Sequence, residues 1–433
     1  MVDADKRLVL DSVGCLMGGF ASAPAAAARA VAEALGGRPQ ATVFGCGLRT
    51  SAALATLANG TALRYLDYND AYGGRDAAHP SGSLPAAFAV AEARRRSGPD
   101  LIAALVAAYE VQIRLCDSAG EPSLKERGWH HTCNLQFAAT AAAARLIGGD
   151  PEITAQALAI SATHQNTLAQ IQHGRIAMIK ATADAWVAKG AVEAALLAEQ
   201  GLTGPDEIFE GASGWTAAVA GAVDYGRLLR PLDGAFGILE ARIKPFAAVG
   251  PAQAPIQAAV EIYARHRPAA EDVEEVIVGL PRRIVEDPAV SGEEKRFPKN
   301  RETADHSYPY CVAVALLEGD CGEAQYAPDR LASPRIRRLL ERTRLEADPE
   351  YSEPRSGGGV RLTLRDGTVH EIRLPFAPGS AGNPLSDLQA EAKFHRQMAV
   401  SFPEPDAAAI KETILGLENC ARIGDLAAML ARP

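Results

Sequence analysis

The stretch VRLTLRDGTVHEI, residues 360–372, predicts a β-hairpin. Hydrophobic and polar side chains alternate on both sides of Asp366-Gly367, and alternation with a period of two is typical of a half-buried strand. An Asp-Gly pair between two such runs is the strongest short-range signal for a hairpin turn. This stretch therefore indicates that part of the chain folds as a small antiparallel sheet.

The segments around the hairpin extend it into a mixed region. Residues 273–278 (VEEVIV) predict another strand, and helical patterns run over residues 308–319 and 334–345. Strands and helices interspersed in this way are typical of an α+β unit. We therefore expect residues 255–383 to form a smaller α+β domain.

The rest of the chain has the composition of packed helices. Of its 85 alanines, 58 lie in the first 250 residues; alanine favours helix, and its small side chain lets helices approach closely. Helical patterning resumes after residue 386. We expect helices near residues 5–18, 99–115, 132–148 and 181–200, with Thr132 as one N-cap and Asp150 as the N-cap of a further helix. The fold class predicted is mainly α with a smaller α+β domain.

Composition excludes several classes of partner and site. The 433 residues include 44 Lys and Arg against 53 Asp and Glu, a net charge of −9, and the arginine runs are too short for a nucleic-acid surface. No stretch approaches the ~20 apolar residues of a membrane span, and the start lacks a signal-peptide pattern. The seven cysteines include no Cys-x-x-Cys pair. We expect a cytoplasmic protein with reduced thiols and neither a nucleic-acid nor a membrane partner.

Polar, titratable side chains concentrate at three places. An apolar segment ends at Asp67 and Asp70, and a Gly-rich loop then leads to His79; an acid and a base candidate on one rim are a pattern for proton transfer, although a plain helix end and loop give the same pattern. The pair His130-His131 precedes a small-residue helix, where an imidazole can act near pH 7. Adjacent histidines in a loop make a weak metal site, because they do not point the same way.

The third place is Lys180, which stands among apolar residues in the segment IAMIKA, residues 176–181. A lysine in such surroundings either extends its stem along a helix face to reach solvent or holds an anion. The residues alone leave both readings open.

Many motifs in register make the chain resemble the MmgE/PrpD family, which includes 2-methylcitrate dehydratases, cis-aconitate decarboxylase and iminodisuccinate epimerase. The resemblance spans nearly the whole chain. The matching segments are residues 59–70 with HPSG at 79–82, GWH at 128–130, Lys180 leading to LLAEQGLTGP at 196–205, FEG at 209–211, KPF at 244–246, RETADHSYPY at 301–310 and NPLS at 383–386.

The resemblance implies a large all-helical domain, residues 1–254 with 384–433, an α+β lid domain inserted between them, residues 255–383, and usually a homodimer. It also implies an active site. Its aspartate corresponds to Asp67, its two histidines to His79 and His130, its lysine to Lys180 and its lid tyrosine to Tyr310.

Two departures bear on the reaction. Ala71 stands where cis-aconitate decarboxylase has a threonine, and the loop from Asp67 to His79 is two residues longer, with Arg75 in the insertion. Both weaken the decarboxylase reading. The segment at residues 301–310 resembles the dehydratase branch, which favours a hydro-lyase.

The chemistry expected is a cofactor-independent dehydration of a small di- or tricarboxylate, most simply 2-methylcitrate or a citrate-like hydroxy acid. It requires removal of a C–H proton beside a carboxylate, protonation of the departing hydroxyl and cations near the developing charge. The histidines carry protons in either order, and Lys180 holds a carboxylate. Weaker candidates for substrate binding are Arg75, Lys244, Gln253 and Lys299. A decarboxylase or an epimerase needs the same groups, and a carboxylate-binding protein without turnover is the alternative of another class. We expect no metal and no cofactor.

Overall fold

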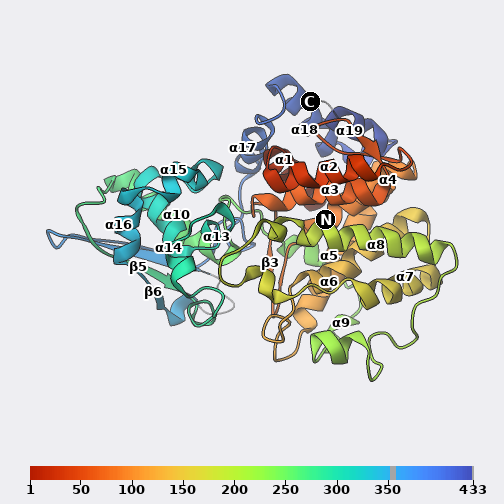
Figure 1. Cartoon of the computed structure of the whole chain (residues 1–433), viewed down its shortest axis with the longest axis horizontal. Coiled ribbons are helices and arrows are strands. Elements are labelled where there is room, and N and C mark those ends of the chain that lie inside the picture. Colours follow the sequence, from red (N-terminus) through yellow and green to blue (C-terminus); the bar gives the residue numbers. More distant parts are fainter. Residues whose placement is uncertain (352–356, 432–433) are drawn as a thin grey trace.

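The structure is a computed structural model that describes residues 1–351 and 357–431, and it is mainly helical (Figure 1). Figure 1 shows two regions side by side. We call residues 2–199 with 387–430 the helical region, and residues 253–374 the sheet region. The expectation of a mainly α chain with a minor β component is confirmed.

Closely packed helices build the first part of the helical region. The pairs α5–α6, α6–α8 and α3–α8 are in extensive contact, and glycine and alanine make that approach possible. A methyl group added at Gly60 in α3 would lie 2.8 Å from Cβ of Ala185 in α8. The helices are α1 (Val2–Gly19), α2 (Ala23–Leu35), α3 (Ala52–Tyr65), α4 (Leu84–Ala93), α5 (Gly98–Ser118), α6 (Thr132–Ile147), α7 (Pro151–His164) and α8 (Ala183–Glu199).

The helix starts show one cap prediction confirmed and one wrong. Asp150 caps α7, and its side chain accepts a hydrogen bond from the backbone N–H of Ile153. Thr132 does not cap α6: it is the first helical residue, and His131 holds the cap position without a side-chain bond. The Thr132 hydroxyl instead lies 3.2 Å from Nδ1 of His130.

The end of the chain packs against its beginning. Helix α17 (Asp387–Met398) and helix α18 (Glu404–Leu415) contact α1, and α19 (Ile423–Leu430) contacts α4. In Figure 1 these blue helices lie next to the red N-terminal ones. Among the described residues no single helix is long and apolar enough to cross a bilayer; by length and composition only, α1 and α2 reach that threshold as a pair, with a 90° bend between them.

The sheet region holds four strands in the order β6-β5-β7-β8. Strand β5 (Val273–Leu280) pairs parallel with β6 (Thr343–Ala347) and antiparallel with β7 (Gly358–Leu364), which pairs antiparallel with β8 (Val369–Leu374). The predicted hairpin is confirmed, with Val360 opposite Ile372. Helix α10 (Gln253–His266) packs on β7 and β8, and α14 (Tyr308–Glu318) packs on α10.

One helix of this region is shorter than predicted. Helix α16 (Pro334–Arg342) ends before Thr343, so the last residues of the predicted helix over 334–345 form a strand instead. The helical pattern does not reveal this switch, because Leu345 lies on β6 opposite Val278 of β5, a contact distant in sequence. Short helices α11 (Arg282–Val285), α12 (Glu293–Arg296) and α13 (Arg301–Ala304) lie between β5 and α14 in the chain. Figure 1 shows α13 on the side facing the helical region.

Candidate active site

Asp67 is the centre of a buried charge cluster. It follows the end of α3, and its backbone has the left-handed φ of 48°. Arg64 Nη1 donates to Asp67 Oδ1 over 2.8 Å, and Lys244 Nζ donates to the same oxygen over 2.6 Å. Lys180 Nζ donates to Oδ2 over 2.8 Å. Side chains from three separate segments thus meet on one carboxylate.

These contacts set the charge state of the cluster. Burial alone would raise the pKa of Asp67, but Arg64, Lys180 and Lys244 together hold it well below its usual range. Burial lowers the pKa of Lys244 to about 8, against the opposing effect of Asp67. Burial and the charge of Arg64 also lower the pKa of Lys180. Asp67 is therefore a carboxylate held by three cations, and Asp184 forms a second ion pair with Arg64 at 3.4 Å.

The two lysines differ in how their donors are used. A lysine ammonium has three N–H donors. Lys244 directs them to the Asp67 carboxylate, the Asp67 carbonyl at 2.6 Å and the Ala248 carbonyl at 3.4 Å. In the part of the chain that the structure describes, the Lys180 ammonium donates to Asp67 alone. Lys180 therefore keeps donors for another anion, whereas Lys244 anchors Asp67.

His79 is held as one tautomer. Its Nδ1 lies 2.6 Å from the carbonyl oxygen of Asp70, so Nδ1 carries the proton and donates it. Its Nε2 lies 3.1 Å from Arg64 Nη2, which can only donate, so Nε2 is the acceptor. Burial and the charges of Arg64 and Lys244 keep the pKa of His79 well below its usual value. His79 is a neutral imidazole with both nitrogens engaged.

His130 and His131 stand beside it. The ring centroids of His130 and His131 are 3.9 Å apart, and those of His79 and His131 are 5.1 Å apart. Burial lowers the pKa of His130 and of His131 well below the usual value, and the cations of the cluster add to the effect at His130. Three neutral imidazoles therefore form one wall of the site.

The loop between Asp67 and His79 is fixed by Asp70. This carboxylate is fully buried and accepts hydrogen bonds from the backbone N–H and hydroxyl of Ser81 and from the hydroxyl of Tyr109 in α5. The short strands β3 (Tyr72–Gly73) and β4 (Ala77–Ala78) pair across the same loop. The acid predicted as a proton-transfer candidate beside Asp67 thus holds the loop in place.

The sheet region contributes a histidine and an ion pair. Nε2 of His306 lies 3.1 Å from Asp67 Oδ2, and its Nδ1 contacts Asp305. Arg301 Nη1 donates to Asp305 over 2.8 Å and to the Tyr65 carbonyl over 2.9 Å. Residues before α14 thereby join the two regions at the cluster.

Asp67, Asp305 and His306 also have the composition of a cation site, with ligand atoms within 4.8 Å of one another. Their carboxylates already receive protein cations, Lys180 on Asp67 and Arg301 on Asp305. A metal ion in this place would compete with those N–H donors. The donor set therefore fits the protein's own ammonium and guanidinium groups.

The structure brings Asp67, His79, His130, Lys180 and Lys244 together, but four predicted residues lie elsewhere. Gln253 is buried and bonds only backbone groups of Phe246 and Ala248, so it shapes the segment after Lys244. Arg75 is exposed and donates to the Ala119 carbonyl, and Lys299 is exposed. The hydroxyl of Tyr310 donates to the Gln325 carbonyl inside the sheet region.

Another tyrosine of the same motif, Tyr308, is affected by the charge of Asp67. Burial raises the pKa of Tyr308, and the charge of Asp67 is among the further causes. The pKa of Tyr310 is raised by burial and by the neighbouring Cys311 and Cys321.

Three residues of the cluster escaped the sequence analysis as site residues. Arg64 reads as an ordinary cation in the last turn of a helix, although it bonds both Asp67 and His79. His306 stands within a motif whose tyrosine drew attention instead. His131 has only the pattern of a weak metal ligand in the sequence. A charged residue one helical turn before Asp67 was the available signal for Arg64.

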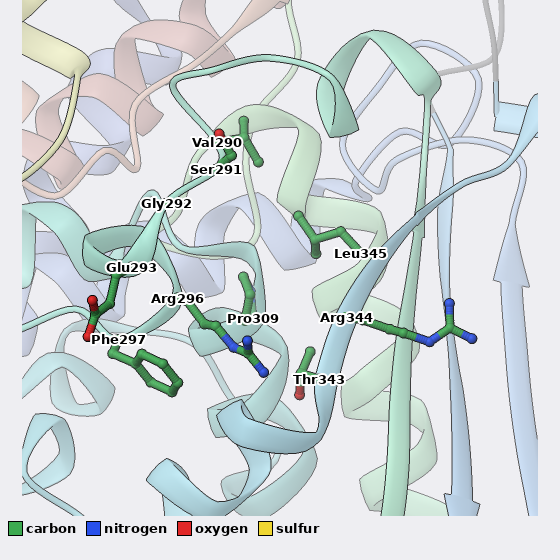
Figure 2. Close-up of a pocket in the computed structure, with 10 residues that line it drawn as sticks. All are labelled: Val290, Ser291, Gly292, Glu293, Arg296, Phe297, Pro309, Thr343, Arg344 and Leu345. Atoms are coloured by element: carbon green, nitrogen blue, oxygen red, sulfur yellow. The ribbon is translucent and has the colours of Figure 1, made fainter.

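A surface pocket in the sheet region is separate from this cluster. It has a volume of about 570 Å³, lies in the sheet region and is lined by residues of the segment before α14 and of β6. Figure 2 shows Arg296 and Phe297 on one side of it and Leu345 on the other. None of the residues around Asp67 lines this pocket.

Known proteins share the pattern over both regions. The family model of the MmgE/PrpD N-terminal domain matches residues 1–227, and that of the C-terminal domain matches residues 246–419. Human cis-aconitate decarboxylase is 26% identical over 461 residues, with 100% of this chain and 91% of that protein covered. The 2-methylcitrate dehydratase of Escherichia coli (strain K12) is 26% identical over 393 residues, covering 82% of this chain and 77% of the relative. The mitochondrial 2-methylcitrate dehydratase of Yarrowia lipolytica is 26% identical over 388 residues, covering 83% and 72%. Because the two family models together span most of a chain whose buried cluster joins both matched parts, the chain belongs to the MmgE/PrpD family.

Proposed function

We propose that the protein is a lyase that removes water from a small hydroxy-di- or tricarboxylate, with 2-methylcitrate or a citrate-like acid as the substrate. One observation carries this proposal. A buried lysine with unused N–H donors, Lys180, shares a site with a neutral imidazole, His130, whose Nε2 is buried without a hydrogen-bond partner among the described residues. Such a pair offers an anion clamp and a base together.

The geometry supports one assignment of the proton-transfer roles that the sequence left open. His79 cannot serve as the base without breaking its bond from Arg64, since that bond occupies Nε2. His130 has a free ring nitrogen, so it takes the C–H proton beside the substrate carboxylate. One spare N–H of Lys180 holds a carboxylate and another supplies the proton for the departing hydroxyl. Carbon loses H⁺ and OH⁻, and an alkene and water result.

Arg64 and Lys244 support this chemistry without contacting the reacting atoms. Both bond Asp67, and Arg64 also fixes the tautomer of His79. Asp67 in turn fixes the Lys180 ammonium. Preorganised charges of this kind favour an anionic transition state, because they need no rearrangement when charge develops.

Decarboxylation is the second candidate. Similarity to human cis-aconitate decarboxylase extends over 100% of this chain, whereas similarity to the Escherichia coli dehydratase covers 82%. Loss of CO₂ from an unsaturated tricarboxylate also builds charge beside a carboxylate, so the same cations and imidazoles serve it. Against it stands Ala71, whose methyl side chain offers no hydroxyl at this place in the loop.

The experiment incubates the protein separately with 2-methylcitrate, citrate and cis-aconitate and follows each by proton NMR. Dehydration yields a new alkene signal from one of the hydroxy acids, and decarboxylation yields a dicarboxylate from cis-aconitate. The His130→Gln variant serves as the control with impaired turnover, and Arg75→Ala as the matched surface control. Loss of CO₂ from cis-aconitate, with no reaction of the hydroxy acids, would replace the dehydratase proposal by the decarboxylase. Binding without turnover of any acid would leave a carboxylate-binding protein.

We also propose that two copies associate through the face formed by α2, the segment Met178–Thr182 and the start of α8. Large apolar side chains are exposed there, among them Leu35, Ile179 and Trp186, and α2 contacts the Met178–Thr182 segment. A contiguous apolar face is a typical interaction surface. Light scattering should give the mass of a dimer, and Trp186→Glu should give a monomer; a monomeric wild type would refute the proposal.

A further inference from the structure

His131 is positioned in the site by packing. It precedes α6, and its ring stacks at a tilt of 39° on His130 and edge-on against His79. The backbone around it is well anchored: the N–H of His130 donates to the Thr167 carbonyl, and the N–H of Asn134 donates to the His131 carbonyl. The imidazole is therefore held in one place without using its own polar atoms.

Both ring nitrogens of His131 lack a hydrogen-bond partner. Within residues 1–351 and 357–431, Nδ1 and Nε2 are each buried and unbonded. A neutral imidazole has one N–H donor and one acceptor nitrogen, and buried polar atoms of this kind are nearly always bonded in folded proteins. Leaving them unbonded costs free energy. Something outside the described chain is expected to bond them.

The neighbouring imidazoles sharpen this point. His79 bonds the Asp70 carbonyl and Arg64 through its two nitrogens, and His130 approaches the Thr132 hydroxyl through Nδ1. His131 alone of the three keeps both nitrogens available. Together with Nε2 of His130, they make three unbonded imidazole nitrogens on the wall beside the cations of the cluster.

A purely structural role does not account for these facts. A ring that only packs against two others would be served as well by phenylalanine, which brings no polar atoms to satisfy. The nearby positive charges also make the place suitable for an anion rather than an apolar group. Packing alone therefore does not explain why this position holds a side chain with two unbonded ring nitrogens.

We propose that His131 contacts the substrate, donating a hydrogen bond to a carboxylate or hydroxyl oxygen of the polycarboxylate. This inference rests on the proposed function and adds a binding residue to it. A neutral imidazole offers one N–H for such an oxygen, beside the ammonium of Lys180. His131 thereby helps to select substrates that carry an extra oxygen at this position.

The test measures binding and stability of His131→Phe. Citrate and tricarballylate, which lacks the hydroxyl, are titrated by calorimetry into the wild type and the variant. We expect the variant to bind about ten- to hundredfold more weakly. The ligand-free variant should unfold at the same or a higher temperature, because the unbonded nitrogens are gone. Weaker binding of both acids points to a carboxylate contact, and weaker binding of citrate alone points to the hydroxyl.

The matched control is His266→Phe. His266 stacks on His370 with ring centroids 3.7 Å apart, but it is exposed and lies in the sheet region. The His266→Phe variant should bind citrate and tricarballylate with unchanged affinity. His131→Gln, which keeps a donor and an acceptor, should recover part of the lost affinity.

The outcomes separate the two proposals. Equal affinity of wild type and His131→Phe would overturn the contact, and so would a large fall in the unfolding temperature of the variant with unchanged affinity. If the wild type binds these acids yet dehydrates no hydroxy acid, the proposed reaction fails while the affinity comparison still decides the role of His131. If the wild type binds neither acid, both proposals are overturned.

Discussion

Two buried lysines, Lys393 and Lys180, show how the same side chain serves opposite purposes. Lys393 in α17 forms an ion pair with Asp11 in α1, with Nζ and Oδ1 2.5 Å apart. It also donates to the Tyr68 carbonyl over 2.8 Å, and its ammonium lies 3.8 Å from the ring centroid of Tyr68. Burial alone would lower the pKa of Lys393, but Asp11 and its other neighbours raise it. Lys180 has a lowered pKa, and among the described residues its ammonium donates a hydrogen bond to Asp67 alone.

The difference lies in how completely the charge is satisfied. At Lys393 the protein supplies an anion, a carbonyl and an aromatic face, so the ammonium is fully engaged and joins the C-terminal helix to the first one. At Lys180 three cations share the Asp67 carboxylate, and one of them, Arg64, also pairs with Asp184. We expect a buried cation with unused donors to bind an anion, whereas a fully satisfied one joins structural elements.

Lys393→Met should produce the largest effect on stability. It leaves Asp11 buried without its cation, and removal of one partner from a buried pair costs about 3–5 kcal/mol. Urea unfolding monitored by circular dichroism measures the loss. The soluble fraction of the variant should keep the wild-type KM, since Lys393 lies outside the site; a raised KM would show that the two lysines are not separate in function.

His130→Gln should lower kcat by at least about 100-fold, the lower range for loss of a positioned acid or base, because Nε2 of His130 is the free base nitrogen. The unfolding transition should barely move, which calorimetry measures. If the variant instead keeps its activity, His79 would have to leave Arg64 and act as the base.

Lys180→Met should raise KM for the polycarboxylate about 10- to 100-fold, since hydrogen bonds to charged groups contribute about 1.5–3 kcal/mol. It should also lower kcat, because the proton donor for the departing hydroxyl is lost. The substitution keeps the aliphatic stem and removes the charge. Initial-rate kinetics measure KM, and an unchanged KM would rule out Lys180 as the clamp. In contrast to Lys393→Met, stability should change little, because Arg64 and Lys244 still neutralise Asp67.

Alkaline pH should weaken the site without weakening the fold through Lys244. Its pKa is about 8 in the folded protein, so above pH 8 the cluster loses a cation and kcat/KM should fall about tenfold per pH unit. Between about pH 8 and 10.5 the unfolded chain holds this proton and the folded one does not, so this group makes stability rise with pH.

The matched variant for that profile is Lys244→Arg, which does not lose its proton in this range. The alkaline fall of kcat/KM should then move to higher pH. An unmoved profile would assign the fall to another lysine with a lowered pKa, either Lys180 in the cluster or Lys295 of α12, whose pKa burial lowers to about 8.

Arg75→Ala should have the smallest effect, less than about twofold on kcat/KM, because surface substitutions away from structural features change energies by about 0.5 kcal/mol or less. The side chain is exposed and bonds one carbonyl. A selective loss for one substrate among several would restore it as the specificity residue that its place in the lengthened loop predicts.

Local patterns predicted what local forces determine. The hairpin at 360–372 and the cap at Asp150 depend on residues within a few positions, and the structure has both. The strand at Thr343 and the positions of Gln253 and Tyr310 depend on distant partners, which no short pattern encodes.

The residues of the candidate site also differ in whether the local sequence reveals them. Asp67, His79, His130 and Lys180 stood out because they follow turns or stand alone in apolar segments. Arg64 and His306 became evident only in three dimensions, since their role comes from the ions beside them. Arg64 and His306 have the sequence pattern of exposed residues, but both are held in the interior by contacts with the Asp67 carboxylate.

The packing of the C-terminal helices α17 and α18 on α1 has a consequence for synthesis on the ribosome. Lys6 in α1 bonds Glu418, 412 positions later, and α1 also packs on α17. Helix α1 packs early on α3, but the face that it turns to α17 and α18 has no cover until those helices emerge. Exposed apolar surface on a nascent chain is where aggregation begins and chaperones bind. Truncation of the last 47 residues, which starts at Asp387, should therefore leave a chaperone-bound or insoluble product rather than a smaller folded one.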